Sequence, residues 1–243
     1  MTDDSAIFEL AARSEQRPEG TSFAQEGFAI LPPVVSVAAC DNLILICKTA
    51  PLSGAGSRTL LALDTIASLG RALAATPSIA ALLPPGARAV QCTLFSKSNA
   101  ANWSVTPHQD LSIPVQERRE LVGWSGWSLK EGTWFVQPPV ALLEQMVAVR
   151  LQLDDNAAET GPLEVVPGTH AMGRLSSEAV RAATAASGKV PCLVERGGVV
   201  VLRPLLIHSS AKGRSAGSRR VLHFLYGPPL PGALANLFDS QLY

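Results

Sequence analysis

Short β-prone runs fill the chain from residue 87 onward and constrain its fold more than any other feature. They include "ARAVQCTLFSK", "MVAVRLQLDD", "GPLEVVPGTH", "VPCLVERGGVVVLRP", "LLIHSS" and "RRVLHFLYGPP", and Gly, Pro, Asn and Ser punctuate them. Many short strands with close turns favour a sandwich or barrel over alternating strand and helix units. We therefore predict a mainly β core, with helices concentrated in the first third of the chain.

The first part of the chain, residues 1 to about 85, is predicted to be largely helical. "SVAACDNLILICKTA" has helical spacing after Ser36, which is a candidate N-cap. "LDTIASLGRALAATPSIAALL" indicates a second helical region that breaks before Pro77, because the residue before a proline is disfavoured in a helix. These helices are expected to flank the β core.

A second departure from the β pattern lies at about residues 111–145. It is too long for a tight turn and holds three of the four tryptophans, Trp124, Trp127 and Trp134. Long insertions in compact domains are usually lids or binding loops. We expect a single domain over residues 1–243 with this segment as a lid, although the tryptophans fit the core of a large loop equally well.

Composition limits the partners of this protein. Its 20 Lys and Arg balance its 20 Asp and Glu, so no net field favours nucleic acid or a membrane surface. Its four cysteines lack the spacing of a zinc site, which indicates reduced, buried thiols. An acidic start without a signal-peptide pattern, and apolar runs far shorter than a bilayer span, predict a cytoplasmic protein, monomeric or homodimeric.

The segment "TPHQDLS" contains the strongest chemical signal. In an extended backbone, His108 and Asp110 point the same way because strand side chains alternate with a period of two. His208, in "PLLIHSS", could supply a third ligand from a distant strand. Two imidazoles and one carboxylate are the ligand set of non-haem Fe(II) oxygenases. Three ligands suffice, because the open positions must take a chelating co-substrate and dioxygen.

A chelating 2-oxo acid also needs a cation for its distal carboxylate, because a buried carboxylate without a partner is costly. The planar fork of an arginine binds a carboxylate bidentately. Arg219 is well placed for this on the strand after His208. Arg220 points to the other face of a regular strand, so the two arginines are alternatives rather than a pair.

These motifs in this order closely resemble the phytanoyl-CoA dioxygenase family of Fe(II)/2-oxoglutarate oxygenases. The resemblance rests on H-x-D, "NAAETGPLEVVPGTH" and "RPLLIHSSAKGRSAGSRRVLHFLYG", and it extends from about residue 28 to residue 228. The opening "EGFAILPPVVS" is similar as well. It implies a double-stranded β-helix, or cupin-like jelly roll, with helices packed outside. One departure is Pro107, where many bacterial relatives carry tryptophan; here the nearest one is Trp103.

The resemblance also implies roles for six residues. The iron ligands are His108, Asp110 and His208, and Arg219 binds 2-oxoglutarate. Ser210 and Gln91 are further candidates for contacts with the co-substrate. The implied reaction couples decarboxylation of 2-oxoglutarate to succinate and CO2 with dioxygen-dependent hydroxylation, or another C–H oxidation, of a small organic substrate. Charge balance and the Trp-containing insertion suggest a modest, partly apolar one, such as an amino acid derivative or a natural-product intermediate.

Several residues keep two interpretations. His170, in "PGTH", is predicted to be a turn residue rather than a fourth ligand. His223 shares the face of Arg219 in a regular strand, so it either lines the pocket or is a satisfied core histidine. Arg150 must be paired in its apolar strand, either with a substrate carboxylate or with Asp154 or Glu164.

Two rival functions fit the same residues. A cupin-like metalloenzyme would use the triad without 2-oxoglutarate, and it predicts that Arg219→Ala leaves activity nearly intact. A degenerate, non-catalytic binding module would keep the fold without binding metal.

Overall fold

The computed structural model describes residues 20–49, 56–98, 101–214 and 218–238. The polar leader, residues 1–19, lies outside them. The helices are α1 (Gly20–Glu26), α2 (Val37–Thr49), α3 (Asp64–Ala75), α4 (Pro77–Ala80), α5 (Val140–Leu143) and α6 (Ser177–Ser187). The strands are β1 (Phe28–Leu31), β2 (Gly56–Ser57), β3 (Arg88–Lys97), β4 (Val105–His108), β5 (Ile113–Val115), β6 (Ser125–Lys130), β7 (Thr133–Gln137), β8 (Val147–Gln152), β9 (Leu163–Val165), β10 (Val190–Cys192), β11 (Val199–Leu202), β12 (His208–Ser210) and β13 (Arg219–Gly227).

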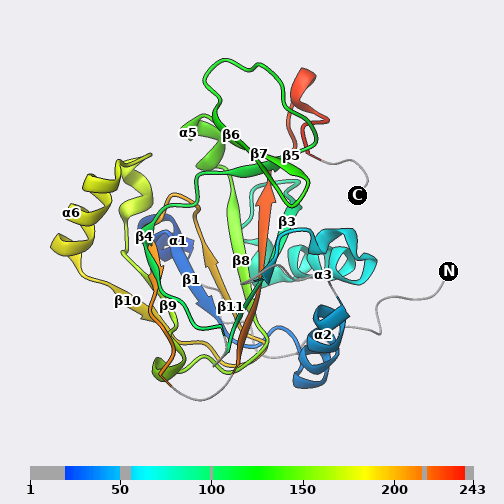
Figure 1. Cartoon of the computed structure of the whole chain (residues 1–243), viewed down its shortest axis with the longest axis vertical. Helices are drawn as coiled ribbons and strands as arrows, with labels where there is room; N and C mark the ends of the chain where they lie inside the picture. Colours follow the sequence, from blue (N-terminus) through cyan, green and yellow to red (C-terminus); the bar gives the residue numbers. More distant parts are fainter. Residues whose placement is uncertain (1–19, 50–55, 99–100, 215–217, 239–243) are drawn as a thin grey trace.

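Two antiparallel sheets form the centre of the molecule (Figure 1). The larger sheet has the order β1-β11-β8-β13-β3-β2, and the smaller has the order β10-β9-β12-β4. One buried cluster takes residues from both sheets, including Val200 and Leu225 from the larger and Val165 and Cys192 from the smaller. The sheets therefore face one another across a common core. This arrangement agrees with the predicted jelly roll.

Helices α2 and α3 cover the outer face of the larger sheet, on the right in Figure 1, whereas α6 lies beyond the smaller sheet. Alternation along β13 explains the arrangement, because Leu222, Phe224 and Tyr226 pack in the outer core with the helices. Residues of the opposite parity, including Arg219 and His223, point between the sheets. The apolar face of the strand thus anchors the helices while the other face builds the site.

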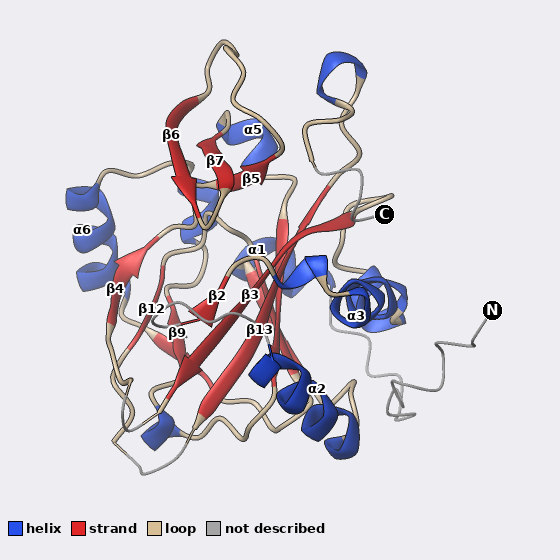
Figure 2. Cartoon of the chain, turned by 45° about the vertical axis from the view of Figure 1, so that its right-hand side comes forward, coloured by secondary structure: helices blue, strands red, loops and turns tan. Residues whose placement is uncertain are grey.

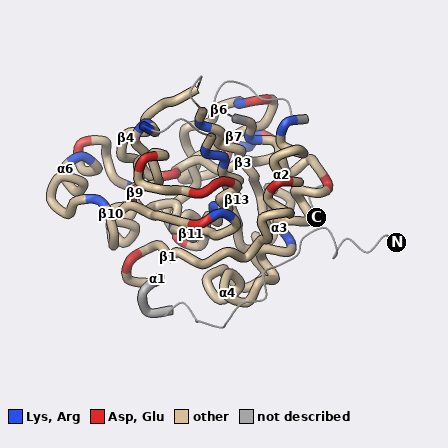
Figure 3. Tube along the Cα trace, turned by 90° about the horizontal axis from the view of Figure 1, so that it is seen from below, with Lys and Arg blue, Asp and Glu red and all other residues tan. Residues whose placement is uncertain are grey.

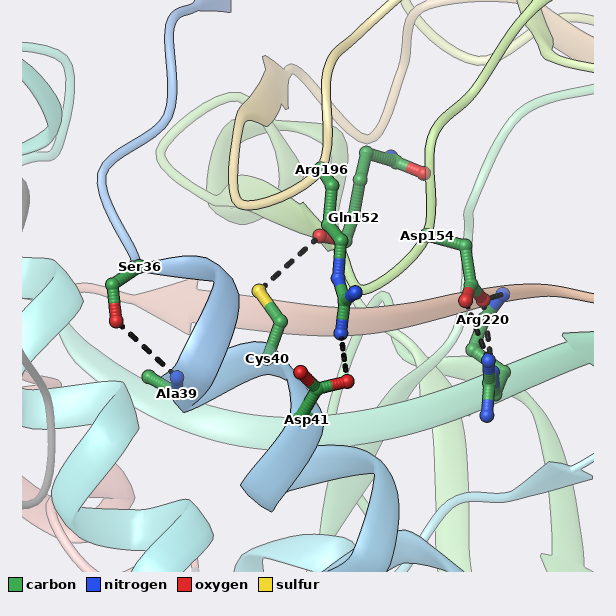
Figure 4. A network of polar contacts seen from close by, with 8 residues as sticks. All are labelled: Ser36, Ala39, Cys40, Asp41, Gln152, Asp154, Arg196 and Arg220. Carbon is green, nitrogen blue, oxygen red and sulfur yellow. Dashed lines mark hydrogen bonds and ion pairs between the residues drawn. The ribbon is translucent and has the colours of Figure 1, made fainter.

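The predicted helix boundaries in the first third are confirmed. Ser36 caps α2, where its hydroxyl accepts a hydrogen bond from the backbone N–H of Ala39 at 3.2 Å (Figure 4). Helix α3 ends at Ala75, before Pro77. It docks closely on the sheet because Gly70 has no side chain: a Cβ there would lie 3.3 Å from the ring of Phe224.

The segment after the H-x-D motif forms a small sheet of order β5-β7-β6, at the top in Figures 1 and 2. The rings of Trp127 and Trp134 meet edge to face, with centroids 6.4 Å apart. These two and Trp124 are partly buried against the inner core. The three tryptophans therefore pack partly against the inner core, and the assignment of the segment as a lid stays a prediction.

Charges of both signs are interspersed along the chain trace (Figure 3). All four cysteines are free and buried, as the sequence predicts, and burial raises the pKa of Cys47 to about 11 and of Cys192 to about 12. Among the described residues, no helix has the length and apolar character needed to cross a membrane.

Candidate metal centre

The structure brings His108, Asp110 and His208 together on the smaller sheet, where β4 and β12 pair. One possible ligand atom from each lies within 4.8 Å of the others. The Nε2 atoms of His108 and His208 are 3.7 and 3.5 Å from the two carboxylate oxygens of Asp110. The histidines are direct partners across β4 and β12, so strand pairing sets their separation. Residues a hundred positions apart thus form one set of N, N and O donors that could hold a metal ion.

Backbone contacts fix the orientation of both imidazoles. The Nδ1 atom of His108 lies 2.8 Å from the carbonyl oxygen of Thr106, and that of His208 lies 2.9 Å from the carbonyl oxygen of Leu206. A carbonyl oxygen only accepts, so each Nδ1 carries the hydrogen. Each Nε2 is then the free lone pair aimed at the common point, which is the tautomer that a metal ligand needs.

Gln109, between the two ligands of the motif, holds the segment from behind. Its side-chain amide donates to the carbonyl oxygens of Gly173 and Leu205, both at 2.7 Å, and its oxygen accepts from the N–H of Leu175 at 2.9 Å. The neighbouring N–H of Asp110 donates to the carbonyl oxygen of Pro204 at 2.9 Å. Because side chains alternate along the segment, Gln109 points away from the ligands and its hydrogen bonds hold the segment in place. The sequence analysis missed this role.

Burial and charge keep His208 and Asp110 in their ligating protonation states. Burial, aided by the charges of His108 and Arg150, lowers the pKa of His208 to about 4, so this imidazole is neutral at pH 7. Burial alone would raise the pKa of Asp110, but the charges of His208, His223 and His108 lower it below its ordinary value. At neutral pH the set therefore includes the neutral imidazole of His208 and the carboxylate of Asp110.

An inner pocket of about 90 Å³ extends from the triad to Arg219, the first residue of β13. Arg219 lines it and is only 5% exposed, and one of its terminal nitrogens lies 3.4 Å from the hydroxyl oxygen of Ser210. The other two guanidinium nitrogens, Nε and Nη1, are buried without a hydrogen-bond partner. Trp103 lines the same pocket, from a position four residues before Pro107. Buried, unpartnered donors of a residue that lines a pocket are what a bound carboxylate would satisfy.

Lys97 also lines the inner pocket, and the sequence analysis missed it. It is the direct partner of Arg219 across β3 and β13. Its ammonium donates to Ser210 Oγ at 2.5 Å and to the carbonyl oxygen of Ala211 at 2.6 Å. Burial and the charge of Arg219 lower its pKa to about 8. A period-of-two analysis of β3, which places Gln91 and Lys97 on one face, could have found it.

Gln91 occupies a different place from Arg219. It lies opposite Leu225, six residues along β13 from Arg219 and so about 20 Å away. It lines an outer pocket of about 390 Å³ on the other side of the triad, which His108, Asp110 and His223 also line. The β5–β7 segment contributes Lys130, Phe135 and Gln137 to its wall. The structure therefore does not bring Gln91 to the pocket of Arg219 and Ser210.

Two further histidines fall outside the ligand set. His223 lines the outer pocket, and a terminal N–H of Arg150 donates to its Nδ1 at 2.8 Å, so its Nε2, 4.0 Å from Asp110, carries the hydrogen. It therefore presents no free lone pair to a metal. His170 lies in a short 3-10 helix, as predicted, and its Nε2 lies 3.1 Å from the carbonyl oxygen of Ala24.

The prediction that Arg220 points away from Arg219 is confirmed. Its guanidinium donates to both oxygens of Asp154, at 2.8 and 2.5 Å, on the outer side of the sheet (Figure 4). Glu164 pairs with Lys189. Both carboxylates therefore have structural roles, and of the neighbouring arginines 219 and 220 only Arg219 lines the inner pocket.

A jelly roll with such a triad beside a buried, unpaired arginine defines the class of Fe(II)/2-oxoglutarate-dependent oxygenases. The family model for phytanoyl-CoA dioxygenase (PhyH) matches residues 23–221. The chain therefore belongs to the phytanoyl-CoA dioxygenase family, which confirms the resemblance found in the sequence. No curated protein matches it in sequence.

Solved structures share the fold at low sequence identity. EctD from S. alaskensis aligns with a TM-score of 0.63 at 15% identity, over 96% of this chain and 84% of that one. HygX from Streptomyces hygroscopicus, solved with nickel and 2-oxoglutarate, gives 0.60 at 17% identity, over 89% and 88%. SnoN, a non-haem α-ketoglutarate-dependent epimerase from nogalamycin biosynthesis, gives 0.59 at 16% identity, over 93% and 84%. These similarities confirm the predicted double-stranded β-helix.

Proposed function

We propose that this protein is an Fe(II)/2-oxoglutarate-dependent oxygenase that oxidises a C–H bond of a small organic molecule. In this proposal His108, Asp110 and His208 hold the iron through their inward-facing atoms. When bound, iron and 2-oxoglutarate supply the activation of dioxygen, with release of succinate and CO2. The observation that carries the proposal is the buried guanidinium of Arg219, whose Nε and Nη1 are unpartnered beside the triad.

The chain's own residues divide the work between the two pockets. Arg219 binds the distal carboxylate of 2-oxoglutarate, and Ser210 and Lys97 assist it, since all three meet in the inner pocket. The desolvation cost of a buried carboxylate is offset there by charge-assisted hydrogen bonds. The backbone hydrogen bonds of both imidazoles orient the Nε2 atoms that would hold the metal.

The outer pocket is assigned to the substrate. It adjoins the triad and has mixed polar and apolar walls, including Gln91, Thr93, Phe95, Phe135 and Gln137. Such a lining fits a small molecule with several polar groups and an apolar part, such as an amino acid derivative or a natural-product intermediate. HygX, a relative in fold, has been solved with hygromycin B bound, which supports a small-molecule substrate here. Gln91 is assigned to this side, rather than to the distal carboxylate.

An anaerobic titration tests the proposal. Fe(II)-loaded protein is titrated with 2-oxoglutarate while the weak visible charge-transfer band of the chelate is followed, with Asp110→Ala and Arg219→Ala in parallel. We expect the band in the wild type and its loss or strong weakening in both variants. A metallated wild type without the band would favour the cupin-like alternative. Failure to bind metal after anaerobic reconstitution would favour a non-catalytic module.

A further inference from the structure

A second arginine, Arg150, is buried beside the candidate metal centre without a carboxylate partner. It lies in the middle of β8 and is 6% exposed. One terminal N–H donates to His223, and its guanidinium carbon lies 5.3 Å from the ring centroid of Phe95. Its Nε is buried with no hydrogen-bond partner. Burial is the largest cause of the lowered pKa of this guanidinium.

The two protein carboxylates expected as its partners are engaged elsewhere. Asp154 pairs with Arg220 on the outer face of the sheet, and Glu164 pairs with Lys189. Within the described part of the chain, no ion pair joins Arg150 to any carboxylate, although the charge of Asp110 acts on it from nearby. Leaving a buried charge unpaired is costly, so a partner from outside the chain is expected.

The inner pocket has an excess of positive charge. Lys97, Arg150 and Arg219 all line it, whereas Asp110 is the carboxylate on its wall. The charge of Arg150 lowers the pKa values of Lys97 and Arg219, and the charge of Arg219 lowers that of Lys97 as well. A metal ion would add further positive charge. A ligand with two negative groups therefore suits this pocket better than one with a single carboxylate.

The position of Arg150 indicates which negative group it would meet. Its direct partner across the strands is His223, four residues along β13 from Arg219. Arg219, Lys97 and Ser210 form one end of the pocket, whereas the charge of Arg150 acts on Asp110 and His208 at the metal end. Arg150 lines the inner pocket, while His223 lines the outer one. Arg150 thus borders the side of the triad assigned to the co-substrate.

We propose that Arg150 is a second anchor for the co-substrate and binds the carboxylate of the 2-oxo acid end, next to the metal, while Arg219 binds the distal carboxylate. The inference rests on the proposed function. It gives 2-oxoglutarate one buried guanidinium at each end. It also makes Arg150 a positioning residue that would hold the chelating end of the co-substrate in one orientation at the metal.

Two co-substrates that differ at one end separate the roles of the arginines. The 2-oxo acid 2-oxopentanoate keeps the chelating end but lacks the distal carboxylate. Dissociation constants for both acids are measured by calorimetry on Fe(II)-loaded protein under anaerobic conditions, for wild type, Arg150→Gln and Arg219→Gln. We expect Arg150→Gln to weaken both acids by the same factor, about 10- to 100-fold. Arg219→Gln should weaken 2-oxoglutarate alone.

Two controls keep the result specific. Arg220→Gln removes an arginine paired on the opposite face of the same sheet, and it should leave both dissociation constants unchanged. Affinity for Mn(II) alone, followed by electron paramagnetic resonance, should be retained in Arg150→Gln. Arg150→Lys, which keeps the charge without the planar fork, should give an intermediate loss and serves if the glutamine variant does not fold.

Three outcomes would overturn the inference. These are unchanged affinity for both acids in Arg150→Gln, a loss confined to 2-oxoglutarate, or a fall in Mn(II) affinity that accounts for the whole loss. Failure of the wild type to bind 2-oxoglutarate at all would instead reject the proposed function, so the two failures are distinguishable.

Discussion

Lys97 and Arg219 face one another across β3 and β13, and both side chains reach the hydroxyl of Ser210, at 2.5 and 3.4 Å. Two cations that share one hydroxyl repel each other, and the repulsion is stronger for buried groups than in water. Their proximity lowers the stability of the unliganded protein and raises its affinity for an anion. This opposition of effects makes Lys97 an informative residue to change.

Lys97→Met keeps most of the side-chain volume and removes the charge. We expect the dissociation constant for 2-oxoglutarate to rise by about tenfold or more, because a charge-assisted hydrogen bond is lost. Thermal unfolding of the metal-free protein should shift little or upward, because repulsion with Arg219 is relieved. Lys189→Met, which removes a surface partner of Glu164, is the control and should not change the affinity. An unaltered affinity in Lys97→Met would contradict the role given to Lys97.

The same lysine predicts a pH effect at alkaline pH. Its pKa is lowered from 10.5 to about 8 by burial, Arg219 and Arg150. Between these pH values Lys97 is protonated in the unfolded chain but not in the folded protein. The contribution of Lys97 to the free energy of unfolding therefore increases as pH rises. Chemical denaturation of metal-free wild type and Lys97→Met should therefore show a difference that shifts in favour of the wild type from about pH 8 to pH 10.5. A constant difference would show that the lysine stays charged.

His208 is expected to make the free energy of unfolding depend on pH on the acid side. Burial lowers its pKa from 6.5 to about 4, so between these values the unfolded chain binds the additional proton. The stabilising contribution is complete above pH 6.5 and is lost as pH falls toward 4, at about 1.4 kcal/mol per pH unit. Denaturation of chelator-treated protein from pH 7 to pH 4 should show this slope, reduced in His208→Gln. Equal slopes in the two proteins would count against a neutral, buried His208.

Gly161 supports the strand that carries Ser210. It has φ +68°, and a Cβ there would lie 2.4 Å from the backbone oxygen of Ala211. Gly161→Ala should therefore destabilise the protein by about 2 to 4 kcal/mol and weaken 2-oxoglutarate binding, because the end of β12 must move. Gly132→Ala also places a side chain at a positive φ, +79°, but has open space around it, and should cost about 1 kcal/mol. Equal losses of stability would mean that strain alone, not the close contact, decides the effect.

Gln109 is expected to control metal affinity without touching the metal. Gln109→Leu leaves two buried carbonyl oxygens and one N–H without their partner, at a cost of about 2 to 5 kcal/mol in unfolding free energy. The motif segment should loosen, and Mn(II) affinity should fall. Gln145→Leu, which removes one exposed hydrogen bond, is the matched control. Full Mn(II) affinity in a folded Gln109→Leu would show that strand pairing alone positions the ligands.

Local pattern was enough to predict the elements that build this protein. Alternation along β13 placed Arg219 and His223 on one face and Arg220 on the other, because a strand has a fixed period of two. Ser36 and Pro77 predicted where helices begin and end, since capping and proline sterics act over a few residues. The order of motifs was enough to assign the family.

The sequence could not predict which side chains pair with one another or which pocket each one lines. The sequence contained Arg150, Asp154 and Glu164 as possible partners, but pairing depends on which sheet face and which neighbouring strand each one meets. Only the register across β3, β8 and β13 decided that Lys97 and Arg150 face the inner pocket and that Gln91 faces the outer one. The chain itself determines the donor set and the alternation of each strand, because both are local. Strand pairing between distant segments decides where the charges meet, because hydrogen-bond registry, not sequence distance, sets their separation.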